Sequence, residues 1–170
     1  MEQSTAQKNI PSLYEWMGGP DALHHLTERF YEKVLKDELL RPLFEGMAAA
    51  HPHHVADFIG EVLGGPAAYT ASRGGHAHMI ARHLGRNISQ AQRRQWVALL
   101  LETADELKLP DDPEFRSAFV AYLEWGSRLA VINSQLPADT KVDESANMPR
   151  WGWGVPGGPY VPDAPVKSDD

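Results

Sequence analysis

Apolar residues three and four positions apart, in runs that end at glycine or proline, most constrain what this chain can fold into. In residues 20–36 this spacing places the apolar side chains on one stripe of an amphipathic helix. The stripe consists of Leu23, Leu26, Phe30 and Val34. The alternating pattern of a half-buried strand does not occur over any useful length, so the sequence predicts an all-α fold without a sheet.

Start and stop residues predict the other helices. Ser12 and Ser89 are each followed three residues later by Glu or Gln, the spacing of a capping box. The expected boundaries run from Ser12 to Gly18-Gly19, from Pro52 to Gly64-Gly65-Pro66, from Ser89 to Pro110, and from Asp112-Pro113 to about Ile132. Residues 39–44 form a short turn, and the weakly periodic residues 67–87 predict a loop that carries one short helix, Met79 to His83.

Composition excludes several classes of function. The chain has no cysteine, which excludes disulfides, thiolate zinc sites, iron–sulfur clusters and thiol nucleophiles. Sixteen Lys and Arg against 23 Asp and Glu give a net charge of -7, which disfavours nucleic-acid binding. Residues 1–10 do not have the pattern of a secretory signal, and no segment reaches the roughly 18 apolar residues of a membrane span. We therefore expect a cytoplasmic protein that does not bind membranes.

The chain divides into three parts by composition. We expect an N-terminal extension over residues 1–11, one helical domain over residues 12–134, and a tail rich in Pro, Gly and Trp over residues 135–170. Such a tail cannot form helix or sheet. Either it is disordered, or Trp151, Trp153 and Tyr160 pack as extended anchors on the domain or on a partner.

Eight histidines make the chain unusual. His24 and His25 lie within the amphipathic helix, and His53 and His54 lie in the first turn of the next helix, so we expect these four mainly at the surface. His51 precedes that helix and can overhang a cavity.

Three further histidines surround the short helix predicted before residue 84. His76, His78 and His83 could bind a non-haem divalent metal, because neutral imidazole is a common metal ligand. His83 alone has a second interpretation. Ile80 before it and Leu84 after it are the apolar neighbours typical of an axial haem ligand. Local chemistry leaves both interpretations open.

Several motifs in order give the chain a family resemblance. They are the run Arg29-Phe30-Tyr31, the Gly64-Gly65-Pro66 stop with Tyr69 after it, the Arg82-His83 pair, and Ile88-Ser89 leading to Trp96. The chain resembles the second group of truncated haemoglobins over about residues 12–134. The resemblance implies a two-over-two helical sandwich around haem b. Two features depart from the family pattern: an extra residue near Gly74-Gly75-His76, and the long tail.

The resemblance also implies roles for single residues. His83 matches the proximal iron ligand, and Tyr31, Trp96, His51 and Val55 match positions on the distal, gas-binding side. The residues implied to contact haem are Phe44, Phe58, Tyr69, Arg73, Met79, Arg82 and Ile88. Among these, Tyr69, Arg73 and Arg82 are candidates to contact the propionates, a role that suits arginine.

Two functions fit this reading. The first is reversible binding of O2, CO or NO for oxygen transport, storage or sensing. The Tyr31 hydroxyl and the Trp96 indole N–H would donate hydrogen bonds to the gas. His51 would be a third polar group, a gate or an iron ligand. The alternative is a haem redox enzyme, peroxidase-like or NO-detoxifying, which would need an external electron-donor reductase. We assign no catalytic residue, and the sequence fits either a monomer or a homodimer.

Overall fold

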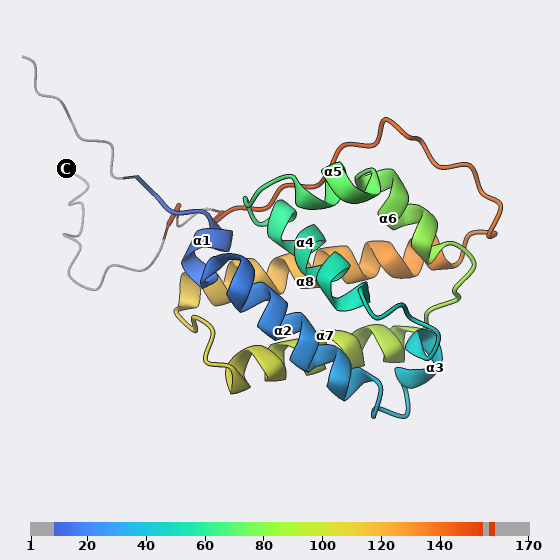
Figure 1. The fold of residues 1–170 in the computed structure, drawn as a ribbon, viewed down its shortest axis with the longest axis horizontal. Helices are drawn as coiled ribbons and strands as arrows, with labels where there is room; N and C mark the ends of the chain where they lie inside the picture. Colours follow the sequence, from blue (N-terminus) through green and yellow to red (C-terminus); the bar gives the residue numbers. More distant parts are fainter. Residues whose placement is uncertain (1–8, 155–156, 159–170) are drawn as a thin grey trace, which may run out of the picture.

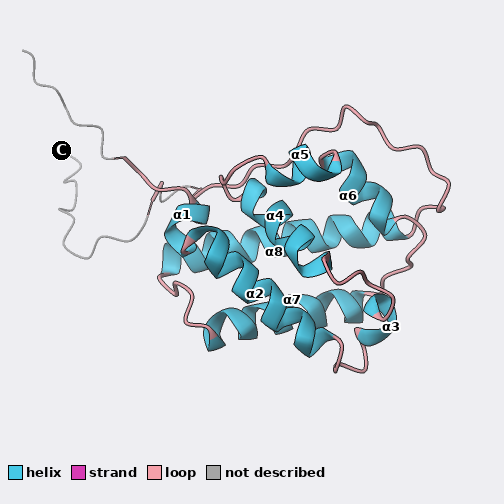
Figure 2. Ribbon diagram, in the orientation of Figure 1, coloured by secondary structure: helices cyan, strands magenta, loops and turns pink. Residues whose placement is uncertain are grey.

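The computed structural model describes residues 9–154 and 157–158, and within these residues it contains eight helices and no strand (Figures 1 and 2). The helices are α1 Leu13–Met17, α2 Gly19–Val34, α3 Arg41–Phe44, α4 His51–Val62, α5 Ala68–Arg73, α6 His76–His83, α7 Gln90–Glu106 and α8 Pro113–Ser134. The predicted all-α fold is confirmed. No helix of the described part is long and apolar enough to cross a membrane.

Two pairs of helices form the body of the molecule. α2 packs against α4 in one pair, α7 packs against α8 in the other, and α2 also contacts α7 (Figure 1). The short α1 lies against α2, while α5 contacts α4 and α6 contacts α8. The arrangement is the expected two-over-two sandwich. The core at its centre contains Phe30, Leu26, Leu100, Phe115 and Phe119, all almost completely buried.

The predicted helix starts are confirmed at atomic detail. The Ser12 hydroxyl accepts a hydrogen bond from the Glu15 amide at 3.0 Å, and α1 ends at Gly18, whose φ of +115° favours glycine. At α7, Ser89 and Gln92 form a reciprocal capping box with bonds of 3.1 and 2.9 Å. Asp112 caps α8 as its sequence position predicts.

The glycines after α4 allow two chain segments to meet closely. Gly64 has a φ of +98°, and a Cβ there would lie 2.8 Å from the Cβ of Ser12. A Cβ on Gly65 would lie 2.8 Å from the Gly60 carbonyl oxygen. Because only glycine fits both positions, the chain can leave α4 sharply and turn into α5.

The prediction of one short helix within residues 67–87 is wrong. The structure has two helices there, α5 and α6, with Gly74 at a φ of +97° between them. α5 has only six residues and no side-chain cap of its own. Instead, the buried Glu61 carboxylate accepts hydrogen bonds from the Thr70 amide, at 2.9 Å, and from the Thr70 hydroxyl. A contact supplied by another helix leaves no local sequence signal.

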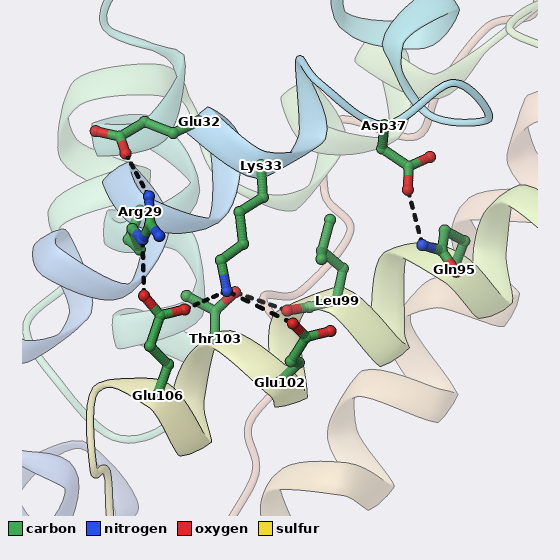
Figure 3. A network of polar contacts seen from close by, with 9 residues as sticks. All are labelled: Arg29, Glu32, Lys33, Asp37, Gln95, Leu99, Glu102, Thr103 and Glu106. Carbon is green, nitrogen blue, oxygen red and sulfur yellow. Dashed lines mark hydrogen bonds and ion pairs between the residues drawn. The ribbon is translucent and has the colours of Figure 1, made fainter.

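Charged residues join α2 to α7 on the outer side of the sandwich (Figure 3). Arg29 Nε donates to Glu106 Oε1 at 2.9 Å, and Lys33 pairs with the same carboxylate. Farther along, Gln95 Nε2 donates to Asp37 Oδ2 at 2.8 Å. Arg29, which belongs to the family motif, therefore contacts the neighbouring helix and does not line the cavity.

Of the two alternatives for the tail, packing on the domain is the one found for Trp151 and Trp153. Tyr160 lies outside the described residues. The segment after α8 runs back over α6 and α5 toward α1 (Figure 1). The Trp151 amide donates to the Val62 carbonyl at 2.9 Å. The Trp153 side chain is 9% exposed, belongs to the core, and donates from Nε1 to the Pro11 carbonyl at 2.7 Å.

The first prediction concerns this anchor. Trp153→Ala should lower the free energy of unfolding by about 3–5 kcal/mol, because a buried indole and its hydrogen bond are lost. Urea denaturation followed by far-ultraviolet circular dichroism measures the change. The exposed Glu144 in the same tail provides the control, since Glu144→Ala should stay within about 0.5 kcal/mol of the parent. A Trp153→Ala protein as stable as the Glu144→Ala protein would show that the tail does not anchor the fold.

Candidate functional site

A cavity of about 540 Å³ lies between the two helix pairs and the α5–α6 segment. Its walls include every residue to which the sequence assigned a site role: Tyr31, Phe44, His51, Val55, Phe58, Tyr69, Arg73, Met79, Arg82, His83, Ile88 and Trp96. These residues come from six helices and one loop. The fold thus brings the whole predicted set to one cavity.

The protonation state of His83, at the end of α6, suits a metal ligand. Its Nδ1 lies 2.8 Å from the Met79 carbonyl oxygen, one turn back in the same helix. A carbonyl can only accept, so Nδ1 carries the proton and Nε2 keeps its lone pair. Burial lowers the pKa of His83, and the Met79 carbonyl opposes that shift. The imidazole is therefore neutral at pH 7 and can donate its Nε2 lone pair.

Three aromatic rings from α2, α3 and α4 pack together at the cavity wall. The centroid of Tyr31 lies 4.9 Å from that of His51 and 5.4 Å from that of Phe44, both edge to face. His51 Nε2 is buried and lacks a hydrogen-bond partner among the described residues. Such an atom costs about 1–3 kcal/mol unless something in the cavity pairs with it. Burial lowers the pKa of His51 to about 4, so this ring is also neutral at pH 7.

Tyr31 and Trp96 bring two hydrogen-bond donors to the same side. Burial raises the pKa of Tyr31 well above its ordinary value, while a side-chain hydrogen bond with Trp96 acts in the opposite direction. The hydroxyl is thus fully protonated at neutral pH and can donate. Phe30 packs edge to face against both rings, at 4.9 Å from Tyr31 and 5.3 Å from Trp96, and fixes their orientation.

The charged groups in the cavity wall are all cationic. Arg73, Arg82, Arg86 and Arg93 line it, and no Asp or Glu among the described residues does. Arg73 also hydrogen-bonds the His54 ring, so His54 is part of the wall and not a plain surface residue as expected. A wall with this charge suits a ligand that carries carboxylates.

Sequence reasoning missed several wall residues. Trp125 on α8, Pro149 in the tail and Arg93 on α7 all line the cavity. Arg93 is 4% exposed and lies 3.4 Å from the Glu124 carboxylate. An ion pair between a buried arginine and a half-exposed glutamate of another helix cannot be read from spacing. Trp125 offers a weak signal, because a large apolar residue outside the core stripe of α8 is unusual.

A haem fits these residues better than a bare metal ion. Within the described residues, no three His, Asp or Glu side chains come close enough to hold a metal ion. The proposed non-haem site at His76, His78 and His83 is therefore contradicted. An apolar cavity with one free imidazole lone pair, an unpartnered His51 nitrogen and an arginine rim suits a flat apolar cofactor with an iron centre and acidic side groups.

Comparison with known proteins points the same way. The family model of bacterial-like globin matches residues 12–124. The Group 2 truncated hemoglobin YjbI of Bacillus subtilis is 30% identical over 117 residues, which cover 69% of this chain and 86% of that protein. A Group 1 truncated hemoglobin of Tetrahymena thermophila is 29% identical and matches 59% of this chain and 80% of its own length.

Solved structures share the fold. The group II truncated hemoglobin of Bacillus anthracis aligns with a TM-score of 0.67 and 25% identity, covering 78% of this chain and 98% of its own. The truncated oxygen-avid haemoglobin of Bacillus subtilis aligns with a TM-score of 0.63 and 30% identity, and the alignment covers 71% of this chain and 99% of that one.

The second prediction tests how the cavity wall is held. Glu61→Ala should lower the free energy of unfolding by about 1–2 kcal/mol, because hydrogen bonds to a charged group are lost. Amide hydrogen exchange at Thr70 should also become faster. Glu61→Gln is the matched control, since its amide oxygen can still accept from the Thr70 amide and should preserve part of the protection. Unchanged exchange in Glu61→Ala would show that α5 is held by other contacts.

Proposed function

The chain belongs to the bacterial-like globins, as a truncated haemoglobin of the second group, and on this premise we propose that it binds haem b with His83 as the proximal iron ligand and reversibly binds O2, CO or NO. Haem is the cofactor of this family, and diatomic gases are its ligands. The observation that carries the proposal is that His83, Tyr31 and Trp96 line a single cavity.

His83 acts on the proximal side. Its proton is held on Nδ1 by the Met79 carbonyl at 2.8 Å, which orients the ring and leaves Nε2 for iron. When bound, the haem would supply an iron that binds a diatomic gas and gives it partial negative charge. Arg73, Arg82 and Tyr69 would contact the propionates, while Met79, Phe58, Phe44 and Ile88 pack against the porphyrin.

Tyr31 and Trp96 act on the distal side. The Tyr31 hydroxyl and the Trp96 indole N–H donate hydrogen bonds to a gas that carries negative charge, and each bond contributes about 1–3 kcal/mol when water is excluded. His51 contributes a third polar group, since its buried Nε2 needs a partner. Val55, one turn farther along α4, lines the same cavity and would limit the space left for the gas. Such a site favours slow release of O2.

A second candidate function is redox chemistry. Four oxidisable rings line the cavity, which favours a peroxidase-like or NO-detoxifying activity: Tyr31, Tyr69, Trp96 and Trp125. Electrons would then come from an external donor or reductase. Multiple-turnover consumption of NO or peroxide, compared with O2 affinity, separates this function from simple gas binding.

The third prediction concerns the iron ligand. His83→Ala should lose haem, or lose the five-coordinate ferrous spectrum of the parent, because no other free imidazole lies at the end of α6. Absorption spectra of the oxidised, ferrous and CO-bound proteins measure this. His78→Ala is the matched control, since His78 lines the same cavity and should leave the spectra unchanged. A parent-like spectrum in His83→Ala would exclude His83 as the ligand.

A low-spin ferrous spectrum in the parent would instead identify His51 as a sixth ligand.

The fourth prediction concerns the distal donors. Tyr31→Phe and Trp96→Phe should each speed O2 release by about 5- to 150-fold, the kinetic equivalent of about 1–3 kcal/mol. Stopped-flow displacement of O2 by CO measures the rate. Release of CO should change much less, because CO takes on little negative charge. If both variants keep the O2 release rate of the parent, neither ring is a donor to the gas.

A further inference from the structure

Four of the five tryptophans form an aromatic series that leads away from the cavity. Trp125 lines the cavity and is also 41% exposed. The Trp151 ring packs on it, with centroids 5.7 Å apart and planes 37° apart. Trp153 follows Trp151 by two residues in the extended tail, and its ring meets Trp16 edge to face at 6.0 Å. Trp16 is 39% exposed and lies at the far end.

We propose that Trp125, Trp151, Trp153 and Trp16 form an electron-transfer route between the cavity and the surface near α1. The external reductant would be a small phenol or aromatic amine that donates at Trp16. The proposal rests on haem binding in the cavity, and it adds a reaction and a donor site to that function.

The geometry gives the route short steps. Two of its three steps are ring-to-ring contacts between side chains. The middle step crosses only Gly152, within one stretch of backbone. Hydrogen bonds fix that stretch at both ends. The Trp151 amide donates to the Val62 carbonyl at 2.9 Å, and the Trp153 indole donates to the Pro11 carbonyl at 2.7 Å. Indole is among the most easily oxidised side chains, so a fixed series of indoles can pass an electron by successive steps.

Trp16 is distinguished by its hydrogen-bond partner. Its indole Nε1 donates to the Asp112 carboxylate at 2.8 Å, whereas the Trp153 indole donates to a neutral carbonyl. An indole that loses an electron becomes strongly acidic at Nε1. The Asp112 carboxylate can take that proton and a backbone carbonyl cannot. Loss of an electron is therefore easiest at Trp16, which makes it the end of the route at which an external donor reacts.

The overall reaction balances with a hydroperoxide as the oxidant. Each hydroperoxide accepts two electrons and two protons to give an alcohol and water, as its O–O bond breaks. Two phenol molecules supply these electrons and protons, one at a time, and each becomes a phenoxyl radical. At Trp16 each electron passes inward and the Nε1 proton moves to Asp112, which releases it to water. The next phenol gives an electron and a proton that restore the indole, and the hydroperoxide takes up one proton from water for each electron it receives.

Mass-spectrometric mapping of trapped radicals tests the route without relying on turnover. The full chain loaded with haem would be mixed with hydrogen peroxide and the spin trap 2-methyl-2-nitrosopropane, then digested. We expect adducts at Trp16 in the parent and none in the haem-free chain. Trp151→Phe should lose the Trp16 adduct and keep that on Trp125. Trp16→Phe, a change at a partly exposed residue, should move the adduct back to Trp151 and Trp125.

Two further variants separate electron transfer from packing. Tyr122→Phe alters a neighbour whose ring lies 5.8 Å from that of Trp151, and it should leave the Trp16 adduct unchanged. Asp112→Asn keeps an oxygen that can cap α8 and accept from Trp16 but cannot take the proton, so it should lower the Trp16 adduct. Equal loss in Tyr122→Phe and Trp151→Phe would overturn the proposal, because packing alone would explain it.

The outcomes also separate this proposal from haem binding. If the parent shows no haem absorption, the proposed function itself fails. If the parent binds haem but forms no adduct on the four tryptophans, only the electron route fails. A Trp16 adduct that persists in Trp151→Phe means that Trp16 is oxidised from solution, which equally rejects the route.

Discussion

The hydrogen bond between His83 Nδ1 and the Met79 carbonyl is the interaction on which the rest of the site depends. It lies within a single turn of α6, so that turn must be helical and must face the cavity. α6 is short and has no side-chain cap, and its position comes from its surroundings. The turn after it is tied to the end of α8 by the Gly85 amide, which donates to the Leu136 carbonyl at 2.9 Å. His83, the proposed iron ligand, is thus held in part by a segment far from it in sequence.

The opposite wall is held mainly by burial. Tyr31 of α2 is buried in the protein core beside Phe30. Arg29 of the same helix pairs with Glu106 of α7 (Figure 3). Exposed ion pairs contribute little to stability, typically less than about 1 kcal/mol each. Packing of Phe30 against both Tyr31 and Trp96 therefore does more to position the two donors than the charged network does. The outer pairs chiefly favour one alignment of α2 on α7 over others.

Local signals in the sequence predicted much of the fold, and contacts between distant segments explain what they missed. The caps at Ser12, Ser89 and Asp112 are made within three residues, so spacing alone reveals them. α5 depends on Glu61, and Trp153 depends on Pro11, which is 142 residues away. The cavity residues were predicted from an ordered family resemblance and not from periodicity, which would have assigned Phe44, Phe58 and Trp96 simply to the core. All of them line the cavity, although their individual roles remain predictions. No motif marked Arg93 or Trp125.

The match to the family ends at residue 124, one position before Trp125. His83, Tyr31, Trp96 and most of the cavity wall lie inside the matched region. Trp125, Pro149 and Trp151 lie outside it, yet the first two still line the cavity. The tail therefore reaches the cavity from outside the region that the family model matches. Pro149 lines the cavity and Trp153 is anchored at Pro11, so the tail links the cavity wall to the segment that leads into α1. The matched region alone does not contain this link.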